Sequence, residues 1–147
     1  MTTSQFDETS LRVRYAETDA MGIVHHSQYV IWFEVGRSSF IRQTGRSYAD
    51  MEQAGYFLRI AEVGVRYHAP ALYDELIVVR TRLSQLQSRG LTFSYQVVRP
   101  AKADGSCPEQ LLVGGFTKLI CTDRQGQVRR FPESFRTILE PLLAPEG

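Results

Sequence analysis

The 147-residue sequence lacks most of the features that mark a specialised class of protein. Its two cysteines, Cys107 and Cys121, cannot form a disulfide framework, and there is no CxxC pair for metal or redox chemistry. No apolar run is long enough to span a bilayer, and the first residues lack the basic and apolar regions of a signal peptide. The net charge is +1, from 17 basic and 16 acidic side chains, so nothing points to a nucleic acid or a membrane as partner. We therefore expect a protein of the reducing cytoplasm.

The composition is that of an ordinary globular protein. An apolar fraction of 43% and a charged fraction of 22% are typical values, and the length is sufficient for one hydrophobic core. The sequence contains no internal repeat and no low-complexity tract. We expect residues 1–147 to form a single domain.

One strongly apolar helix is predicted in the first half of the chain, from Ser27 to Thr44. Ser27 is a suitable N-cap and Gly45 a suitable stop. Gly36 in mid-helix costs about 1 kcal/mol relative to alanine, which indicates close packing of the backbone at that point. The apolar residues surround most of the cylinder, which predicts a buried helix; those at helical spacing are Tyr29, Trp32, Phe33, Gly36 and Phe40.

Most of the remaining chain alternates with period two, which is typical of antiparallel strands. Residues 1–8 are expected to be loose, and a short strand at 11–15 would place Leu11, Val13 and Tyr15 on one face. A second short helix is predicted at 47–53, and a closing helix runs from Pro132 to about residue 143. Gly114-Gly115 indicates a bulge or a close approach. Further strands are predicted at 57–67, 75–83, 91–99, 110–122 and 128–130.

This order of elements predicts an α+β fold in which an antiparallel sheet curls over a central helix. A sheet of this size has an exposed edge or face, and so we expect dimers formed by pairing of sheets.

The loop ahead of the long helix carries two acids, Glu17 and Asp19, and the pair His25-His26. Unpaired N–H groups and the helix dipole at a helix start favour developing negative charge. A carbonyl oxygen held there would be polarised, and Asp19 could attack the carbonyl carbon or activate water. Glu17 would point the same way as Asp19 on an extended backbone and raise the pKa of one acid, or else be a solvated turn acid. Judged by its position alone, an acid such as Asp19 is more often a turn or capping residue than a catalyst.

Three histidines also suggest a metal site, formed by His25, His26 and His68. Adjacent histidines point apart on most backbones, and no carboxylate–histidine spacing supports such a site, so we predict no metal. The aromatic stripe of the helix is interpreted as core. Tyr29, in the first turn, is the exception expected to line a pocket, with Tyr67 facing the same cleft from a neighbouring strand.

The segment 15–29, YAETDAMGIVHHSQY, resembles the signature of hotdog-fold acyl-CoA thioesterases of the 4-hydroxybenzoyl-CoA thioesterase/YbgC type. A second matching stretch, VRYHAPALYDEL, covers residues 65–76, and the resemblance as a whole covers about residues 9–140. It implies a sheet wrapped around the 27–44 helix, homodimers or homotetramers, an active site at the dimer interface, and no cofactor or metal.

The resemblance also implies roles for single residues. Asp19 falls on the catalytic carboxylate of the family, and His26 on the residue whose backbone N–H polarises the thioester carbonyl. His25 departs from the family, in which an aromatic residue is common, and this leaves the shape of the acyl pocket open. Residues expected to bind or shape the substrate site are Tyr15, Gly22, Val24, Tyr29 and Tyr67, and those expected to hold the phosphates of coenzyme A are Arg89, Arg129 and Arg130.

The function that follows is hydrolysis of an acyl-CoA to the free acid and CoA. The acyl group is either aromatic, such as a hydroxybenzoyl or dihydroxynaphthoyl unit, or a short to medium aliphatic chain, and the thioester of an acyl-carrier protein is a further candidate substrate. Two alternatives remain: an acyl-thioester binding protein without hydrolase activity, and a dehydratase or hydratase acting on an acyl thioester.

Overall fold

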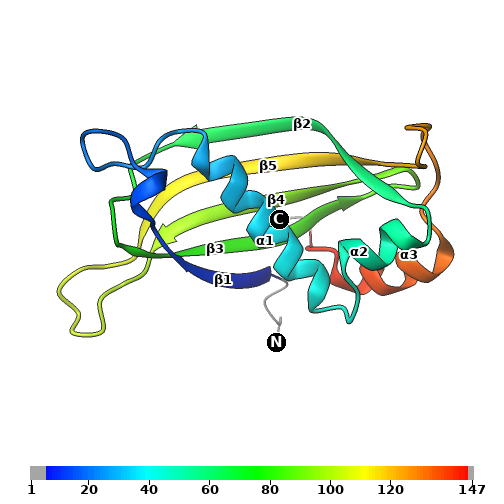
Figure 1. Ribbon diagram of the computed structural model, residues 1–147. Helices are drawn as coiled ribbons and strands as arrows, with labels where there is room; N and C mark the ends of the chain where they lie inside the picture. The colour runs from blue at the N-terminus through cyan, green and yellow to red at the C-terminus, as the bar shows by residue number, and fades with distance from the viewer. Residues whose placement is uncertain (1–5, 146–147) are drawn as a thin grey trace.

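A computed structural model describes residues 6–145. Figure 1 shows one long sheet with the helix α1 lying diagonally across one of its faces. All strand pairs are antiparallel, and the strand order is β1-β3-β4-β5-β2. The strands are β1 (Phe6–Arg12), β2 (Phe57–Tyr67), β3 (Leu76–Leu86), β4 (Gly90–Arg99) and β5 (Gln110–Thr122). This is the predicted α+β architecture, and the four long strands lie at or close to their predicted positions.

The helix α1 spans Gln28–Arg42 and packs against the sheet through the predicted aromatic stripe. Its close approach depends on Gly36, because a Cβ there would lie 2.3 Å from Thr81 Oγ1. The Phe33 ring stacks on Tyr95 at a centroid distance of 4.3 Å and lies over Gly115, where a Cβ would clash with it. The close approach predicted for the paired glycines of β5 is therefore confirmed at Gly115, while the bulge between β4 and β5 lies at Leu112.

The prediction that α1 is buried almost all round is wrong. Ile31 is 50% exposed, and Glu34 is exposed as well. Only one face of the helix meets the sheet, because the sheet covers α1 from one side within a single chain. The other face is left to solvent or to another molecule.

The first strand was also predicted at the wrong place. It begins at Phe6, within the stretch expected to be loose, and it ends at Arg12; residues 1–5 lie outside the described part of the chain. Backbone pairing with β3, from Phe6 opposite Arg82 to Arg12 opposite Leu76, forms this strand despite its polar side chains. Tyr15 does not share a face with Val13, because residues 15–17 form a short 3-10 helix, η1 (Tyr15–Glu17).

The remaining helices follow the prediction more closely. The short helix α2 (Tyr48–Gln53) has Ser47 as its N-cap, in a capping box with Asp50. The closing helix α3 (Glu133–Leu139) starts after Pro132, which is the N-cap and not the first helical residue, and it continues into the 3-10 helix η2 (Glu140–Leu142). The strand predicted at 128–130 is reduced to one bridge between Thr122 and Val128. No helix among residues 6–145 is long and apolar enough to cross a membrane.

Candidate active site

Asp19 lies at the tip of a small hairpin between η1 and α1. Its backbone N–H donates to Ile23 O at 2.8 Å, and its Oδ1 accepts the N–H of Met21 at 2.8 Å. Gly22 has a φ of +79°, in the left-handed region that favours glycine, and so it permits the tight turn. The Asp19 side chain is exposed to solvent. Asp19 can therefore both stabilise the turn and belong to a reactive site, because only one of its carboxylate oxygens accepts the hydrogen bond of the turn.

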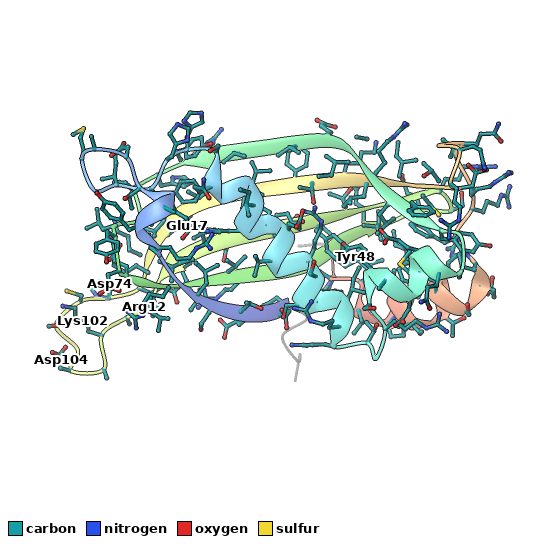
Figure 2. All side chains as sticks on the ribbon, viewed as in Figure 1. Arg12, Glu17, Tyr48, Asp74, Lys102 and Asp104 are labelled. Atoms are coloured by element: carbon teal, nitrogen blue, oxygen red, sulfur yellow. The ribbon has the colours of Figure 1, made fainter. Side chains whose placement is uncertain are left out.

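Glu17, at the base of the same hairpin, is neither a solvated turn acid nor a partner of Asp19. Its side chain is buried, with 4% of the residue exposed, and Oε2 accepts the indole N–H of Trp32 at 2.8 Å. Burial raises the pKa of this carboxyl, but hydrogen bonds from the Arg14 backbone and the Trp32 indole, with the nearby Arg14 charge, bring its pKa below the usual value. Figure 2 shows Glu17 beside α1. Both alternatives that the sequence offered for Glu17, a coupled acid and a solvated turn acid, are therefore wrong.

The start of α1 is formed differently from the prediction. Ser27 is the residue before the helix, but its hydroxyl makes no capping bond and lies 2.8 Å from His25 Nδ1 instead. Gln28 N–H donates to His25 O at 3.0 Å. Among the hydrogen bonds of residues 6–145, none is donated by the His26 N–H. The His26 N–H is therefore a free backbone donor at the positive end of the helix dipole.

An apolar cleft of about 280 Å³ lies beside this helix start. Tyr29 and Tyr67 meet there edge to face, with ring centroids 5.6 Å apart. Both hydroxyls are engaged by the backbone, since Tyr67 donates to His26 O at 3.0 Å and Tyr29 accepts from Ala71 N–H at 3.0 Å. The cleft is lined by Ile23, Val24, His26, Tyr29, Tyr67, His68, Ala69 and Pro70.

The cleft therefore gathers four of the predicted site residues: Val24, His26, Tyr29 and Tyr67. Asp19 does not line it, but is joined to it through its hydrogen bond to Ile23. Gly22 is held nearby, because its carbonyl accepts the N–H of Tyr73 at 3.1 Å. Tyr15 is not brought to the cleft; it is 77% exposed and packs edge-on against Tyr73.

Sequence reasoning missed part of the cleft lining, namely Ile23 and the turn His68-Ala69-Pro70. The turn residues follow directly after β2, so the proline just beyond the strand was the available signal for them; Ile23 lies in the Asp19 hairpin instead. The backbone of this turn is fixed by β5, because the N–H groups of His68 and Ala69 both donate to Leu112 O.

The histidines do not form a metal centre within the described residues. Residues 6–145 contain no group of three or more His, Cys, Asp or Glu side chains that could hold an ion. The expectation that adjacent histidines point apart is nevertheless wrong here. The rings of His25 and His26 lie together, with centroids 4.2 Å apart and planes tilted by 32°.

The three arginines proposed for CoA lie at the other end of the sheet. Arg89 O accepts the N–H of Cys121, and Arg129 N–H donates to Cys121 O, so both flank the end of β5 opposite the cleft. In Figure 1 the turn after β5 and the 15–27 loop occupy opposite ends of the molecule. The strand β2 that joins these ends spans about 33 Å. Arg130, like the other two, is exposed.

Known proteins resemble this chain in both fold and sequence. The family model for the thioesterase-like superfamily matches residues 13–139. A putative acyl-CoA thioesterase of Bacillus subtilis, YneP, is 34% identical over 78% of each chain. Two solved structures superpose with TM-scores of 0.85 and 0.83: a hypothetical protein of Thermus thermophilus, at 38% identity over 95% of this chain and 99% of that one, and the DHNA-CoA thioesterase of Staphylococcus aureus, at 28% identity over 93% and 90%.

The chain therefore belongs to the thioesterase-like superfamily, and its fold is the hotdog fold of thioesterases.

Proposed function

We propose that this protein is an acyl-CoA thioesterase, which hydrolyses the thioester to the free acid and CoA. The observation that carries the proposal is the free His26 N–H at the start of α1, beside an apolar cleft and one hairpin away from Asp19. The family match and the relative named as a putative acyl-CoA thioesterase favour hydrolysis over the binding-protein and dehydratase alternatives.

In the proposed reaction, the thioester carbonyl oxygen accepts the N–H of His26. A preorganised donor of this kind contributes about 3 kcal/mol to stabilisation of the developing oxyanion. Asp19 either takes a proton from the attacking water or attacks the carbonyl carbon itself to give an anhydride, which water then opens. In both routes the C–S bond breaks and CoA leaves as the thiol. The exposed position of Asp19 gives water access to its carboxylate.

The cleft favours an aromatic acyl group. Because the hydroxyls of Tyr29 and Tyr67 are already bound to the backbone, these residues present ring surfaces and not polar groups to a ligand. The DHNA-CoA thioesterase of S. aureus, a structural neighbour, takes an aromatic acyl-CoA by its name. A short to medium aliphatic acyl group would use the same apolar lining.

We further propose that two copies pair through β2. This strand lies at an edge of the sheet, and three of its apolar side chains, Ile60, Val63 and Tyr67, are between 38% and 51% exposed. An unpaired edge of eleven residues with such side chains is a template for another strand. Antiparallel pairing of β2 with its copy would cover this edge, and a tetramer would add a second interface.

Such a dimer would also bring the arginines to a substrate. In a symmetric antiparallel pair, the Tyr67 end of one β2 lies beside the Phe57 end of the other. The end of the partner that carries Arg89, Arg129 and Arg130 would then face the cleft of the first copy. We accordingly propose that the CoA phosphates are held across the dimer.

The free thiols Cys107 and Cys121 are consistent with a reducing cytoplasm.

The test is a panel of aromatic and aliphatic acyl-CoA thioesters, with an acyl-carrier-protein thioester included, assayed by thiol release. We expect hydrolysis, fastest with an aromatic substrate, and a loss of kcat of at least about 1,000-fold in Asp19→Asn with an unchanged melting temperature. A matched control is Asp74→Asn, an exposed acid in a neighbouring turn, with near wild-type activity.

Other outcomes decide against the proposal. Altered enoyl absorbance without thiol release would identify a hydratase or dehydratase. A ligand-induced rise in melting temperature without turnover would identify a binding protein. Full kcat in a folded Asp19→Asn protein would remove Asp19 from the mechanism.

A further inference from the structure

The buried acid Glu17 takes no part in the proposed chemistry, yet it has a complete set of partners. Oε1 accepts the backbone N–H of Arg14 at 2.7 Å, and Oε2 accepts the indole N–H of Trp32 at 2.8 Å. The Arg14 guanidinium lies 3.5 Å from Oε2. A buried carboxylate is costly unless it is paired and hydrogen-bonded, and here all three partners are supplied by two residues.

The backbone of Glu17 closes the base of the hairpin that carries Asp19. Glu17 O accepts the N–H of His25 at 2.9 Å, and the next rung is the bridge between Thr18 and Val24. Asp19 follows directly, with its own bond to Ile23. Any shift of Glu17 is therefore transmitted to Asp19 through two consecutive rungs of backbone hydrogen bonds.

Trp32 belongs to a different element from the hairpin. It lies one turn into α1, is 1% exposed, and is fixed by an edge-to-face contact with Tyr29, at a centroid distance of 5.0 Å. The bond from its indole to Glu17 thus connects the hairpin base to the helix whose first turn borders the cleft. The other side of the hairpin is held by the turn after β2, where Val24 N–H donates to Ala71 O at 2.9 Å.

We propose that Glu17 is a positioning residue, which fixes the Asp19 hairpin relative to the start of α1 through its bond to Trp32. This inference rests on the proposed function. The two groups that hydrogen-bond the Glu17 oxygens are N–H donors, and the third partner, the Arg14 guanidinium, is a donor as well, so the site needs a side chain that only accepts hydrogen bonds. Glutamine would turn its own NH₂ group against one of the two donors and would separate hairpin from helix.

The kinetic test uses Glu17→Gln, Trp32→Phe and the double variant. Trp32→Phe keeps an aromatic ring in the core but removes the donor. Because small displacements of a reacting group are costly, we expect kcat to fall about 10- to 100-fold in each single variant, with KM changed less than about twofold. The double variant should be no slower than the slower single variant, since both changes remove the same bond.

The control is Thr117→Val, which removes a buried hydrogen bond with Tyr95 Oη elsewhere in the core. It should lower the melting temperature but leave kcat unchanged, so a loss of stability can be distinguished from a loss of position. Trp32 is also the single tryptophan of the chain. Its fluorescence emission spectrum should shift in Glu17→Gln, where a neutral amide replaces the charge beside the indole, and not in Thr117→Val.

The inference is overturned if folded Glu17→Gln keeps the wild-type kcat, if the losses of the two single variants multiply in the double variant, or if Thr117→Val loses as much kcat as Glu17→Gln. Should Glu17→Gln not fold, Trp32→Phe decides: a reduced kcat supports the inference and a wild-type kcat overturns it. Failure of the proposed function looks different, because the wild-type protein would then release no thiol, or Asp19→Asn would remain active.

Discussion

The two ends of the sheet differ in how their side chains are held. At the cleft end, hairpin, helix and turn are joined by bonds that leave little freedom, including Glu17 to Trp32 and Tyr29 to Ala71. At the far end, the arginines are exposed, and the side chain of Arg129 forms a partly exposed ion pair with Asp123. The first end is suited to fixing the geometry of a reaction, and the second to holding a charged and flexible group by attraction.

This difference shows why a single chain is an incomplete enzyme in our proposal. Residues that fix the thioester and residues that hold phosphates lie at opposite ends of β2, about 33 Å apart. Only a second copy, paired antiparallel along this edge, would bring the two kinds of end together.

The largest effect is expected from breaking the β2 edge. In Val63→Arg, a charge replaces an apolar side chain at the centre of the proposed pairing, so the protein should become monomeric. If the site requires the partner, kcat/KM should fall by at least about 100-fold. Size-exclusion chromatography with light scattering measures the first change and thiol release the second. Leu143→Arg, at an exposed apolar residue off this edge, is the control and should change neither; a fully active monomer would refute the shared site.

A smaller effect is expected from the arginines. In Arg89→Ala and Arg129→Ala, KM for acyl-CoA should rise about three- to tenfold with kcat unchanged, and salt should weaken the effect. Lys102 is the informative comparison, because Figure 2 places it at the cleft end of its own chain. If Lys102→Ala raises KM and the arginine variants do not, coenzyme A is held by the chain that carries the cleft, and the partner has no part in it.

The smallest effect concerns stability at the cleft end. Arg99 binds Glu75 through two hydrogen bonds, and Glu75 in turn accepts the N–H of Leu72. The Arg99 hydrogen bonds hold the pKa of Glu75 below its usual value although burial opposes them. The stabilisation is therefore present above the unfolded pKa, near 4.3, and is lost as the pH falls through the lower folded pKa.

Glu75→Gln should accordingly reduce the free energy of unfolding by about 1 kcal/mol at pH 7, and the difference should vanish in acid. Urea unfolding at a series of pH values measures it. Arg129→Ala, which removes the exposed pair at the far end, should show almost no stability change at any pH. Equal losses of stability in the two variants would mean that the ion pairs at the two ends of the sheet contribute equally to folding.

Much of the fold could be predicted from the sequence, because the patterns that mark its strands and its main helix are local. Period-two alternation located β2 and β5, and the aromatic spacing of α1 identified its buried face, since each pattern reflects one element packing against one surface. The first strand could not be found in this way. Most of its side chains are polar, and Phe6–Arg12 is a strand because β3 offers it a free edge.

Glu17 likewise could not be assigned from the local sequence. Its sequence neighbours suggest a solvated acid, and nothing local indicates that an indole fifteen residues away will bury it. The sequence by itself determined the architecture of an antiparallel sheet over one helix, which its family resemblance identified as the hotdog fold, together with the glycines of close approach and the presence of an acid ahead of a helix start. Only the tertiary structure decided which acid is buried, that Tyr15 lies away from the cleft and where the arginines lie, because these depend on contacts between elements far apart in the chain.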